Sequence, residues 1–215
     1  MEIQRINSYV DKRFSEKVLL QHGCFLADDI PYEVEIISDH EAIIRGENKH
    51  IYQEIIENFR FFTPHITKFY NMDGQLVREY QQEQLLNICL DEIQPSQFFI
   101  DEDKIDAVST FIQKSQDIII QVLRFEGRYI SLDGHTRLYY AAMKEWSVVR
   151  AVVMEALDEW AIRFAEEARK RKIFTPKDMV MVCHSEYEEK WNRFCDDFLA
   201  AGEECPAHLE RSKTK

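Results

Sequence analysis

The segment SLDGHTRLYYAA places an acid, a histidine, a hydroxyl and an arginine around Gly134. The residues before it resemble a strand, and those after it form an apolar helical run. A glycine between a strand and a helix lets the backbone approach a ligand, and the unpaired N–H groups of the first helical turn attract an anion. Phosphate is the anion that suits this geometry best. The segment therefore predicts a phosphate or nucleotide site.

Each side chain of this turn has a predicted role. Arg137 can form a charge-assisted fork with phosphate oxygens, and the Thr136 hydroxyl supplies a further donor. Asp133 would repel phosphate, so we expect it to contact Mg²⁺ or to act as a base for a hydroxyl. His135 could donate to phosphate or shuttle a proton near neutral pH. In a purely structural alternative, Asp133 caps the helix and pairs with Arg137.

The composition predicts a folded protein that disfavours nucleic acid as a partner. Of 215 residues 45% are hydrophobic, and 27 Lys and Arg against 39 Asp and Glu give a net charge of −12. This charge repels a phosphate backbone unless the cations cluster on one face. The apolar runs are far shorter than the ~20 residues that cross a bilayer, and the first residues lack the apolar stretch of a secretory signal. We expect a soluble cytoplasmic protein without a membrane partner.

The cysteines predict neither a disulfide framework nor a zinc site. They are odd in number and scattered, with no C-x-x-C pair and no paired histidine spacing. Cys89 and Cys195 lie among apolar residues and are predicted to be small core residues.

Hydropathy patterns predict an α+β protein in four parts. Residues 1–83 form an N-terminal α+β segment with two hairpins and a helix, and residues 84–156 form the core that carries the turn. Residues 157–205 are helical, and residues 206–215 form a flexible tail.

In the N-terminal segment, YEVEII and EAIIRG predict one hairpin and Asp73-Gly74 marks a second. Ile51, Ile55, Ile56 and Phe59 share one face of a helix. The segment FTPHITKFY could line the pocket of the core, with Thr63 and His65 as candidates.

In the core, Asp101 is the predicted N-cap of a helix that buries Ile105, Val108, Phe111 and Ile112. IIIQVLRF and RYISL form a hairpin at Glu126-Gly127, and a helix and the strand VVRAVVM follow the Asp-Gly turn.

In the helical segment, Asp158 is a predicted N-cap, and Ser185 with Glu188 is a predicted capping box for the last helix. This helix carries an aromatic stripe that we expect to pack on the rest of the protein, with a homodimer interface as the alternative. The stripe consists of Tyr187, Trp191, Phe194, Cys195 and Phe198.

The stretch from IQPSQFFIDEDKIDAVSTFIQ to IIIQVLRFEGRYISLDGHTRLYYAAMKEWSVVRAVV resembles the core of the ParB/sulfiredoxin superfamily. In that superfamily an I-x-P segment, a helix, a strand and an Asp-Gly turn precede a further strand. The resemblance implies a compact α+β domain that binds a nucleotide, ATP, ADP or CTP, with the turn around the phosphates. It does not cover the N-terminal segment or the C-terminal helices.

The turn distinguishes between branches of the superfamily. Sulfiredoxins have a cysteine where this chain has His135, so reduction of sulfinic acids is not expected. ParB proteins have a Gly-Glu-Arg-Arg turn, whereas free-serine kinases have Asp-Gly-His-His-Arg, which this chain matches at four of five positions. The kinase resemblance implies that Asp133 serves the substrate hydroxyl or a metal, and that Gly134, His135 and Arg137 bind phosphates.

The predicted opposite wall of the pocket holds Ser96 and Gln97. The kinases have a glutamate as the proposed base where this chain has Gln97, and an amide cannot take a proton. Asp91 or Glu92 could substitute for it.

Three functions follow as hypotheses. The first is a nucleotide-binding protein, with phosphoryl transfer to a small hydroxyl substrate such as serine and with Mg²⁺ as cofactor. The second is a DNA-associated ParB-like protein or nuclease. The third is a non-catalytic regulatory or interaction protein that keeps the fold.

Overall fold

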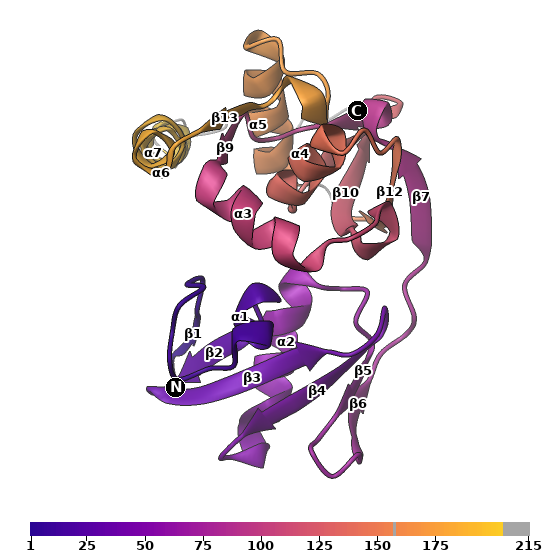
Figure 1. Cartoon of the computed structure of the whole chain (residues 1–215), viewed down its shortest axis with the longest axis vertical. Helices are drawn as coiled ribbons and strands as arrows, with labels where there is room; N and C mark the ends of the chain where they lie inside the picture. Colours follow the sequence, from indigo (N-terminus) through magenta and orange to yellow (C-terminus); the bar gives the residue numbers. More distant parts are fainter. Residues whose placement is uncertain (157, 204–215) are drawn as a thin grey trace, which may run out of the picture.

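The computed structural model describes residues 1–156 and 158–203, and it is an α+β protein with two main sheets. The N-terminal sheet and its helices form one unit, and the second sheet with the other helices forms another (Figure 1). The helices are α1 (Glu16–Leu20), α2 (Tyr52–Phe62), α3 (Glu102–Phe111), α4 (His135–Met143), α5 (Glu159–Lys170), α6 (His184–Tyr187) and α7 (Arg193–Glu203). The strands are β1 (Ile3–Arg5), β2 (Cys24–Ala27), β3 (Ile30–Ile36), β4 (Glu41–Gly46), β5 (Lys68–Tyr70), β6 (Leu76–Glu79), β7 (Leu85–Cys89), β8 (Ile93–Gln94), β9 (Phe99–Asp101), β10 (Ile119–Phe125), β11 (Arg128–Ser131), β12 (Val148–Met154) and β13 (Val180–Val182).

The N-terminal sheet has the strand order β1-β2-β3-β4-β5-β6, and its strand β2 is covered on both faces. Side chains alternate across a strand, and all four residues of β2 are buried. Cys24 and Leu26 pack with Val18 and Leu19 of α1, whereas Phe25 packs with α2. Both predicted hairpins and the helix between them are confirmed, as β3–β4, β5–β6 and α2. Strands β1 and β2 and helix α1 were not predicted.

The second unit is built on a five-stranded mixed sheet with the order β7-β12-β10-β11-β8. Ile120 and Val122 of β10 face the core beneath α3 and α4, and Leu123 faces Ala161 and Ala165 of α5 on the other side. The remaining two strands, β9 and β13, form a short parallel pair.

The local signals of the second unit are largely confirmed. Glu126 and Gly127 have φ angles of 50° and 77° and connect β10 to β11 as predicted. Asp101 caps α3 through the backbone N–H of Asp103, and Asp158 caps α5 through Ala161. A glycine or a short polar residue tolerates a positive φ better than most residues, which explains the hairpin signal.

Three predictions about single residues are wrong. Phe111 is 38% exposed, because the last turn of α3 faces the N-terminal unit. Cys89 is exposed rather than in the core, because it alternates with buried Ile88 at the end of an edge strand. The last helical segment begins after Cys183, not at a capping box of Ser185, because β13 pairs with β9 up to Val182.

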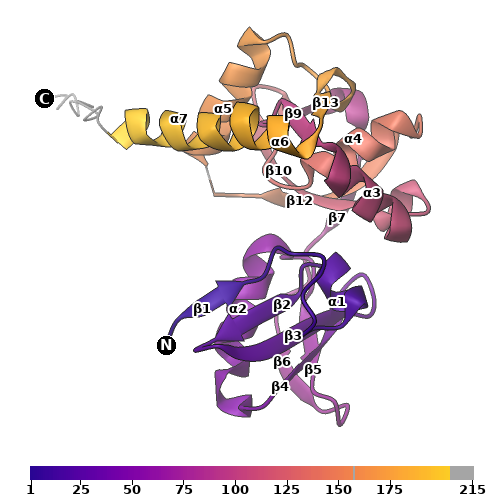
Figure 2. The same ribbon diagram turned by 60° about the vertical axis from the view of Figure 1, so that its left-hand side comes forward.

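The predicted packing of the stripe on the rest of the protein is confirmed for its four aromatic residues. Helix α6 continues through a π-helical turn into α7, and the C-terminal end of α7 projects beyond the second unit (Figure 2). Trp191 and Phe194 contact the main core, with ring centroids 4.7 and 5.0 Å from Phe98. Phe194 and Phe198 also pack on Phe164 of α5. The homodimer alternative stays a prediction.

The two units contact each other along one side. The carboxylate of Asp39 forms an ion pair with both terminal nitrogens of Arg150 on β12, and Gln121 donates to the carbonyl of Phe61 at 3.1 Å. Helix α1 lies beside α3. Within the described ranges, no helix is long and apolar enough to cross a membrane. The predicted tail and Cys205 lie outside those ranges.

Candidate functional site

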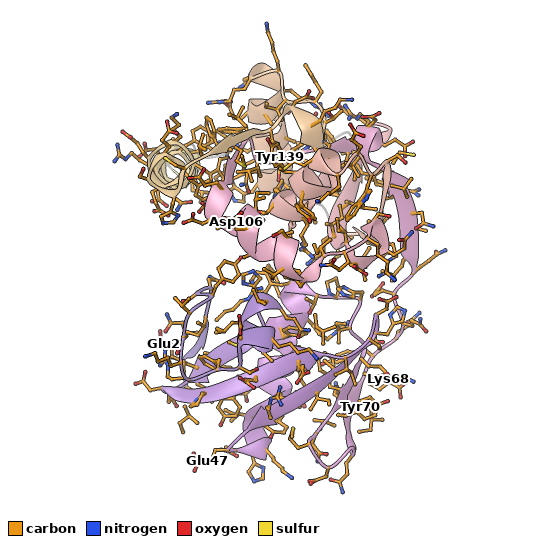
Figure 3. The ribbon with its side chains drawn as sticks, in the orientation of Figure 1. Glu2, Glu47, Lys68, Tyr70, Asp106 and Tyr139 are labelled. Atoms are coloured by element: carbon orange, nitrogen blue, oxygen red, sulfur yellow. The ribbon has the colours of Figure 1, made fainter. Side chains whose placement is uncertain are left out.

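A cavity of about 740 Å³ lies between the two units. Side chains from both units point into the space between their ribbons (Figure 3). The N-terminal unit contributes residues of β1, α1 and the loop after β3, and the second unit contributes residues of α3 and of the Asp-Gly turn. The predicted turn is therefore part of a site shared by two units. Its lining includes Asp133, Gly134, His135, Thr136 and Arg137.

Basic side chains outnumber carboxylates in this cavity, although the whole chain is acidic. Five basic residues line it, namely Arg5, Lys17, Lys104, Arg137 and Arg150. The three carboxylates are Asp39, Asp117 and Asp133. Such a surplus of positive charge inside a hollow attracts an anionic ligand.

Three of the five cations are held in ion pairs. Lys17 contacts Glu35 at 2.6 Å, Arg137 contacts Asp133 at 3.0 Å, and Arg150 contacts Asp39. Within residues 1–156 and 158–203, Arg5 and Lys104 have no carboxylate within ion-pair distance. Two cations, one from each unit, are thus available to a ligand.

The backbone of the turn requires glycine. Gly134 has a φ of 80°, and a Cβ atom there would lie 2.7 Å from Ile120 Cγ2 and 2.9 Å from Arg137 Nη2. Gly134 is also the N-cap residue of α4, without any side-chain cap. The predicted alternative in which Asp133 caps the helix is therefore wrong, whereas its pairing with Arg137 is confirmed. The first N–H groups of α4 lie beside the cavity lining, as the phosphate prediction requires.

Arg137 is held firmly by the second unit. Its Nη1 donates to the carbonyl of Ile119 at 2.6 Å and its Nη2 to Asp133 at 3.0 Å. A guanidinium has five N–H donors, so donors are left for a ligand. Burial raises the pKa of Asp133, but the Arg137 charge and the Gly134 N–H outweigh it and lower that pKa below its usual value. Asp133 is therefore ionised at neutral pH, as a metal contact would need.

His135 is buried and uncharged. Its Nε2 accepts from the backbone N–H of Ser96 at 3.3 Å and lies 2.9 Å from the hydroxyl of Ser131. Burial, together with the charge of Arg137, lowers the pKa of His135 to about 4. The ring therefore does not suit the predicted proton shuttle near neutral pH. Its hydrogen bonds instead fix the turn to the segment after Pro95.

The two predicted residues of the opposite wall are placed differently. Ser96 is buried, donates to the carbonyl of Ser131 at 2.7 Å and does not line the cavity. Gln97 does line it, and its amide donates to the carbonyl of Phe99 at 2.5 Å and to the hydroxyl of Tyr187 at 3.3 Å. The amide is thus used to hold the wall.

The candidates for a substitute base lie elsewhere. Neither Asp91 nor Glu92 lines the cavity, and Asp91 pairs with Lys177 at 3.0 Å on the surface. By contrast, the predicted contribution of the segment FTPHITKFY is confirmed, since Thr63 and His65 both line the cavity.

Three residues that were not predicted as site residues, Arg5, Tyr9 and His22, also line the cavity. The Tyr9 hydroxyl lies 3.2 Å from Nε2 of His22, and the guanidinium of Arg5 stacks 3.7 Å from the ring centroid of Phe62. These residues belong to no motif. Only the packing of the first unit on the second brings them to the turn, so no local signal could have found them.

The donor set tests the predicted role of Asp133 as a Mg²⁺ ligand. In the part of the chain that the structure describes, the group of three potential ligand residues is Asp101, Asp103 and His184, which does not include Asp133. Mg²⁺ commonly binds one or two carboxylates together with phosphate oxygens and water. Asp133 fits such a role only when a ligand supplies the other oxygens.

Comparisons with known proteins give weak likenesses to solved structures. No family model and no curated protein matches the chain. Among solved structures, the chain is similar to protein Atu1540 from Agrobacterium tumefaciens, with 15% identity and a TM-score of 0.30, over 45% of this chain and 53% of that one. It is also similar to a conserved hypothetical protein from Pyrococcus furiosus, with 19% identity and a TM-score of 0.30, over 37% of this chain and 35% of that one. The chain thus spans about half and about a third of their lengths, and likenesses this weak carry no argument about function.

Proposed function

We propose that the cavity binds a nucleotide, with its phosphates at the Asp133–Arg137 turn. The observation that carries the proposal is the surplus of basic side chains in a cavity of an acidic protein, beside a glycine turn and a helix N-terminus. A phosphate group satisfies backbone N–H groups and a guanidinium together. The volume of about 740 Å³ also lies in the range of small-molecule sites.

The resemblance to the ParB/sulfiredoxin superfamily supports the same ligand. The stretch that carries the resemblance folds in the order β8, β9, α3, β10, β11, α4 and β12, with the turn directly before α4. In the proposed assignment Gly134, Thr136 and Arg137 contact phosphates, and His135 and Ser96 hold the turn in place. ATP, ADP and CTP are the ligands to test.

Phosphoryl transfer to a small hydroxyl compound is the activity that this site would support. Positioning and charge neutralisation dominate such reactions, and Asp133 is the carboxylate beside Arg137 that could orient the hydroxyl or a phosphate-bound Mg²⁺. One observation favours a second function, a nucleotide-binding regulator without catalysis. Gln97 stands where the resemblance to the kinases implies a base, and it is an amide that hydrogen-bonds to Phe99 and Tyr187.

Replacing Arg137 tests the phosphate site. We expect Arg137→Ala to weaken nucleotide binding by about 1.5–3 kcal/mol, the usual value of a hydrogen bond to a charged group. Isothermal titration with ATP, ADP and CTP measures the change. The control is Arg124→Ala, an exposed arginine of β10 outside the cavity lining, which should bind like the wild type.

Arg137 also binds the carbonyl of Ile119, so the fold of each variant is checked by thermal unfolding. Arg137→Lys keeps the charge but loses the fork, and its affinity should lie between those of the wild type and Arg137→Ala. Wild-type affinity in a folded Arg137→Ala protein would refute the phosphate site.

Replacing Asp133 tests its predicted link to Mg²⁺. We expect Asp133→Asn to remove the Mg²⁺ dependence of nucleotide binding and to improve binding without Mg²⁺, because the carboxylate no longer repels the phosphates. The unfolding free energy should change by less than about 1 kcal/mol, since its ion pair is partly exposed. Titrations with and without Mg²⁺ measure this. Asp106→Asn on the exposed side of α3 is the control (Figure 3), and a Mg²⁺ dependence that persists in Asp133→Asn would exclude the role.

A further inference from the structure

Arg5 is a cation of the N-terminal unit, and no carboxylate of the described part of that unit forms an ion pair with it. It ends β1, its Nε donates to the carbonyl of His22 at 3.1 Å, and its guanidinium lies over the ring of Phe62 at 3.7 Å. These contacts fix the stem and one face of the guanidinium. Its charge has no carboxylate within ion-pair distance in the described ranges, and both terminal nitrogens keep their donors for another partner.

The charges of both units converge at this place. Burial lowers the pKa of Arg5, the charge of Asp133 in the other unit opposes this, and the charge of Arg137 adds to it. Burial likewise lowers the pKa of His22 to about 4, and Arg5, Arg137 and Lys104 all add to this effect. The charge of Asp133 opposes this effect. His22 shares the cavity lining with these three cations, which come from β1, α3 and α4.

Like charges that share a cavity repel each other and are costly when partly buried. Asp133 pairs with Arg137 and its charge also acts on Arg5, but among the described residues neither Arg5 nor Lys104 has a carboxylate within ion-pair distance. Among residues 1–156 and 158–203, the polar contacts of the Lys104 amine are with the hydroxyl of Tyr187, at 3.5 Å, and with the face of the Tyr187 ring. A ligand with several negative charges would remove this repulsion, whereas a single phosphate at the turn would leave it largely in place.

We propose that Arg5 and Lys104 form a second anion subsite that faces the Asp133–Arg137 turn, so that the ligand is a nucleoside di- or triphosphate that bridges the two units. This inference rests on the proposed function and gives the N-terminal unit a role in it. One phosphate group binds at Gly134 and Arg137, and another binds at Arg5 and Lys104. Val108 and Phe111 of α3 supply apolar surface to the same cavity, which suits a nucleoside base.

The test compares AMP with ADP and ATP, each in the presence of Mg²⁺, by isothermal titration of the full chain. The wild type should bind ADP and ATP at least about tenfold more tightly than AMP, since a second charge-assisted contact contributes that much or more. Arg5→Gln, which keeps most of the stem and loses the charge, should weaken ADP and ATP about tenfold or more and AMP less than about threefold. Arg5→Lys should retain most of the preference.

The matched control is Arg78→Gln, an exposed arginine of β6 in the same unit that does not line the cavity. It should leave all three affinities unchanged, which separates a local contact from a change in net charge. Thermal unfolding confirms that Arg5→Gln is folded, and Arg5→Lys and Lys104→Gln test the subsite independently.

The outcomes separate this inference from the function on which it rests. If Arg137→Ala loses binding while Arg5→Gln and Lys104→Gln keep the wild-type preference for ADP over AMP, the phosphate site stands and the second subsite is refuted. Equal weakening of AMP and ADP in Arg5→Gln would also refute it. If the wild type binds none of the three nucleotides, the proposed function itself fails.

Discussion

Lowering the pH from 7 to 4 should reduce the unfolding free energy of this protein by several kcal/mol. The reason is a set of three histidines that are kept neutral in the folded state around one cavity. The pKa of His22 is lowered to about 4, that of His65 to about 3 and that of His135 to about 4, in each case mainly by burial. An unfolded histidine has a pKa of about 6.5.

The sign follows from proton binding. Below about pH 6.5 the unfolded chain takes up protons at these histidines and the folded chain does not, so unfolding becomes easier as the pH falls. Each histidine contributes up to about 1.4 kcal/mol per pH unit, and the loss levels off only below its folded pKa. Over two pH units the three together amount to roughly 5 kcal/mol or more, before any relaxation of the cavity. This is a large part of the stability of an ordinary domain.

Other titrating groups act in a different pH range. The carboxylates with lowered pKa values, such as Asp39 beside Arg150, add to the loss mainly below about pH 4. His184 has the opposite sign, because its hydrogen bond to Asp101 raises its pKa. Its contribution is present at low pH and is lost as the pH rises above about 6.5. Between pH 6.5 and 4 the change in unfolding free energy therefore comes mainly from the three cavity histidines.

Urea unfolding at a series of pH values measures this dependence. His65 is 8% exposed. In His65→Gln the slope of unfolding free energy against pH should decrease by the amount that corresponds to about one bound proton. The control is His50→Gln, because His50 is an exposed residue that does not line the cavity. A wild-type slope near zero between pH 6.5 and 4.5 would mean that these rings are not kept neutral. Bound nucleotide should not be present in these experiments, since it would add its own linkage.

The elements of the second unit could be predicted from sequence because their signals are local. An Asp at the start of α3, a Glu-Gly pair between β10 and β11 and alternating apolar residues each determine structure within a few residues. The errors occur where a distant segment decides the environment. Phe111 lies on the apolar face of α3, but it lines the cavity between the two units instead of the core. The start of α6 is set by the pairing of β13 with β9, which lies more than 75 residues earlier in the chain.

The candidate site was predictable only for its half on the turn. The types and spacing of Asp133, Gly134 and Arg137 carry chemical meaning by themselves, and the structure brings them to a cavity. Arg5 and His22 precede that turn by more than a hundred residues and have no motif. Their proximity to the turn depends on how the two units pack, through contacts such as the ion pair of Asp39 with Arg150. No periodic pattern in the sequence predicts this packing.

Gly134→Ala should destabilise the protein by about 2–5 kcal/mol and abolish nucleotide binding. Two costs add. A left-handed backbone costs a residue with a Cβ atom about 1–2 kcal/mol, and overlap with neighbouring atoms in a packed region costs about 1–3 kcal/mol more. The overlap is with Cγ2 of Ile120, a core atom beneath α4, and with the guanidinium of Arg137. Relief of the second contact would move Arg137 away from its place beside Asp133.

The chain contains a control that separates these two costs. Gly127 has nearly the same backbone conformation, with a φ of 77°, but a Cβ atom there would meet nothing within 4 Å. Gly127→Ala should therefore be destabilised only by the backbone cost, about 1–2 kcal/mol. It should bind nucleotide like the wild type. Urea unfolding of both variants gives the difference between them, which is the cost of the overlap at the turn. Equal stabilities of the two variants would show that the side chains of Ile120 and Arg137 move aside at little cost in free energy. In the proposed site the backbone at Gly134 lies close to the ligand and leaves no room for a side chain. Unchanged nucleotide affinity in a folded Gly134→Ala protein would contradict this arrangement.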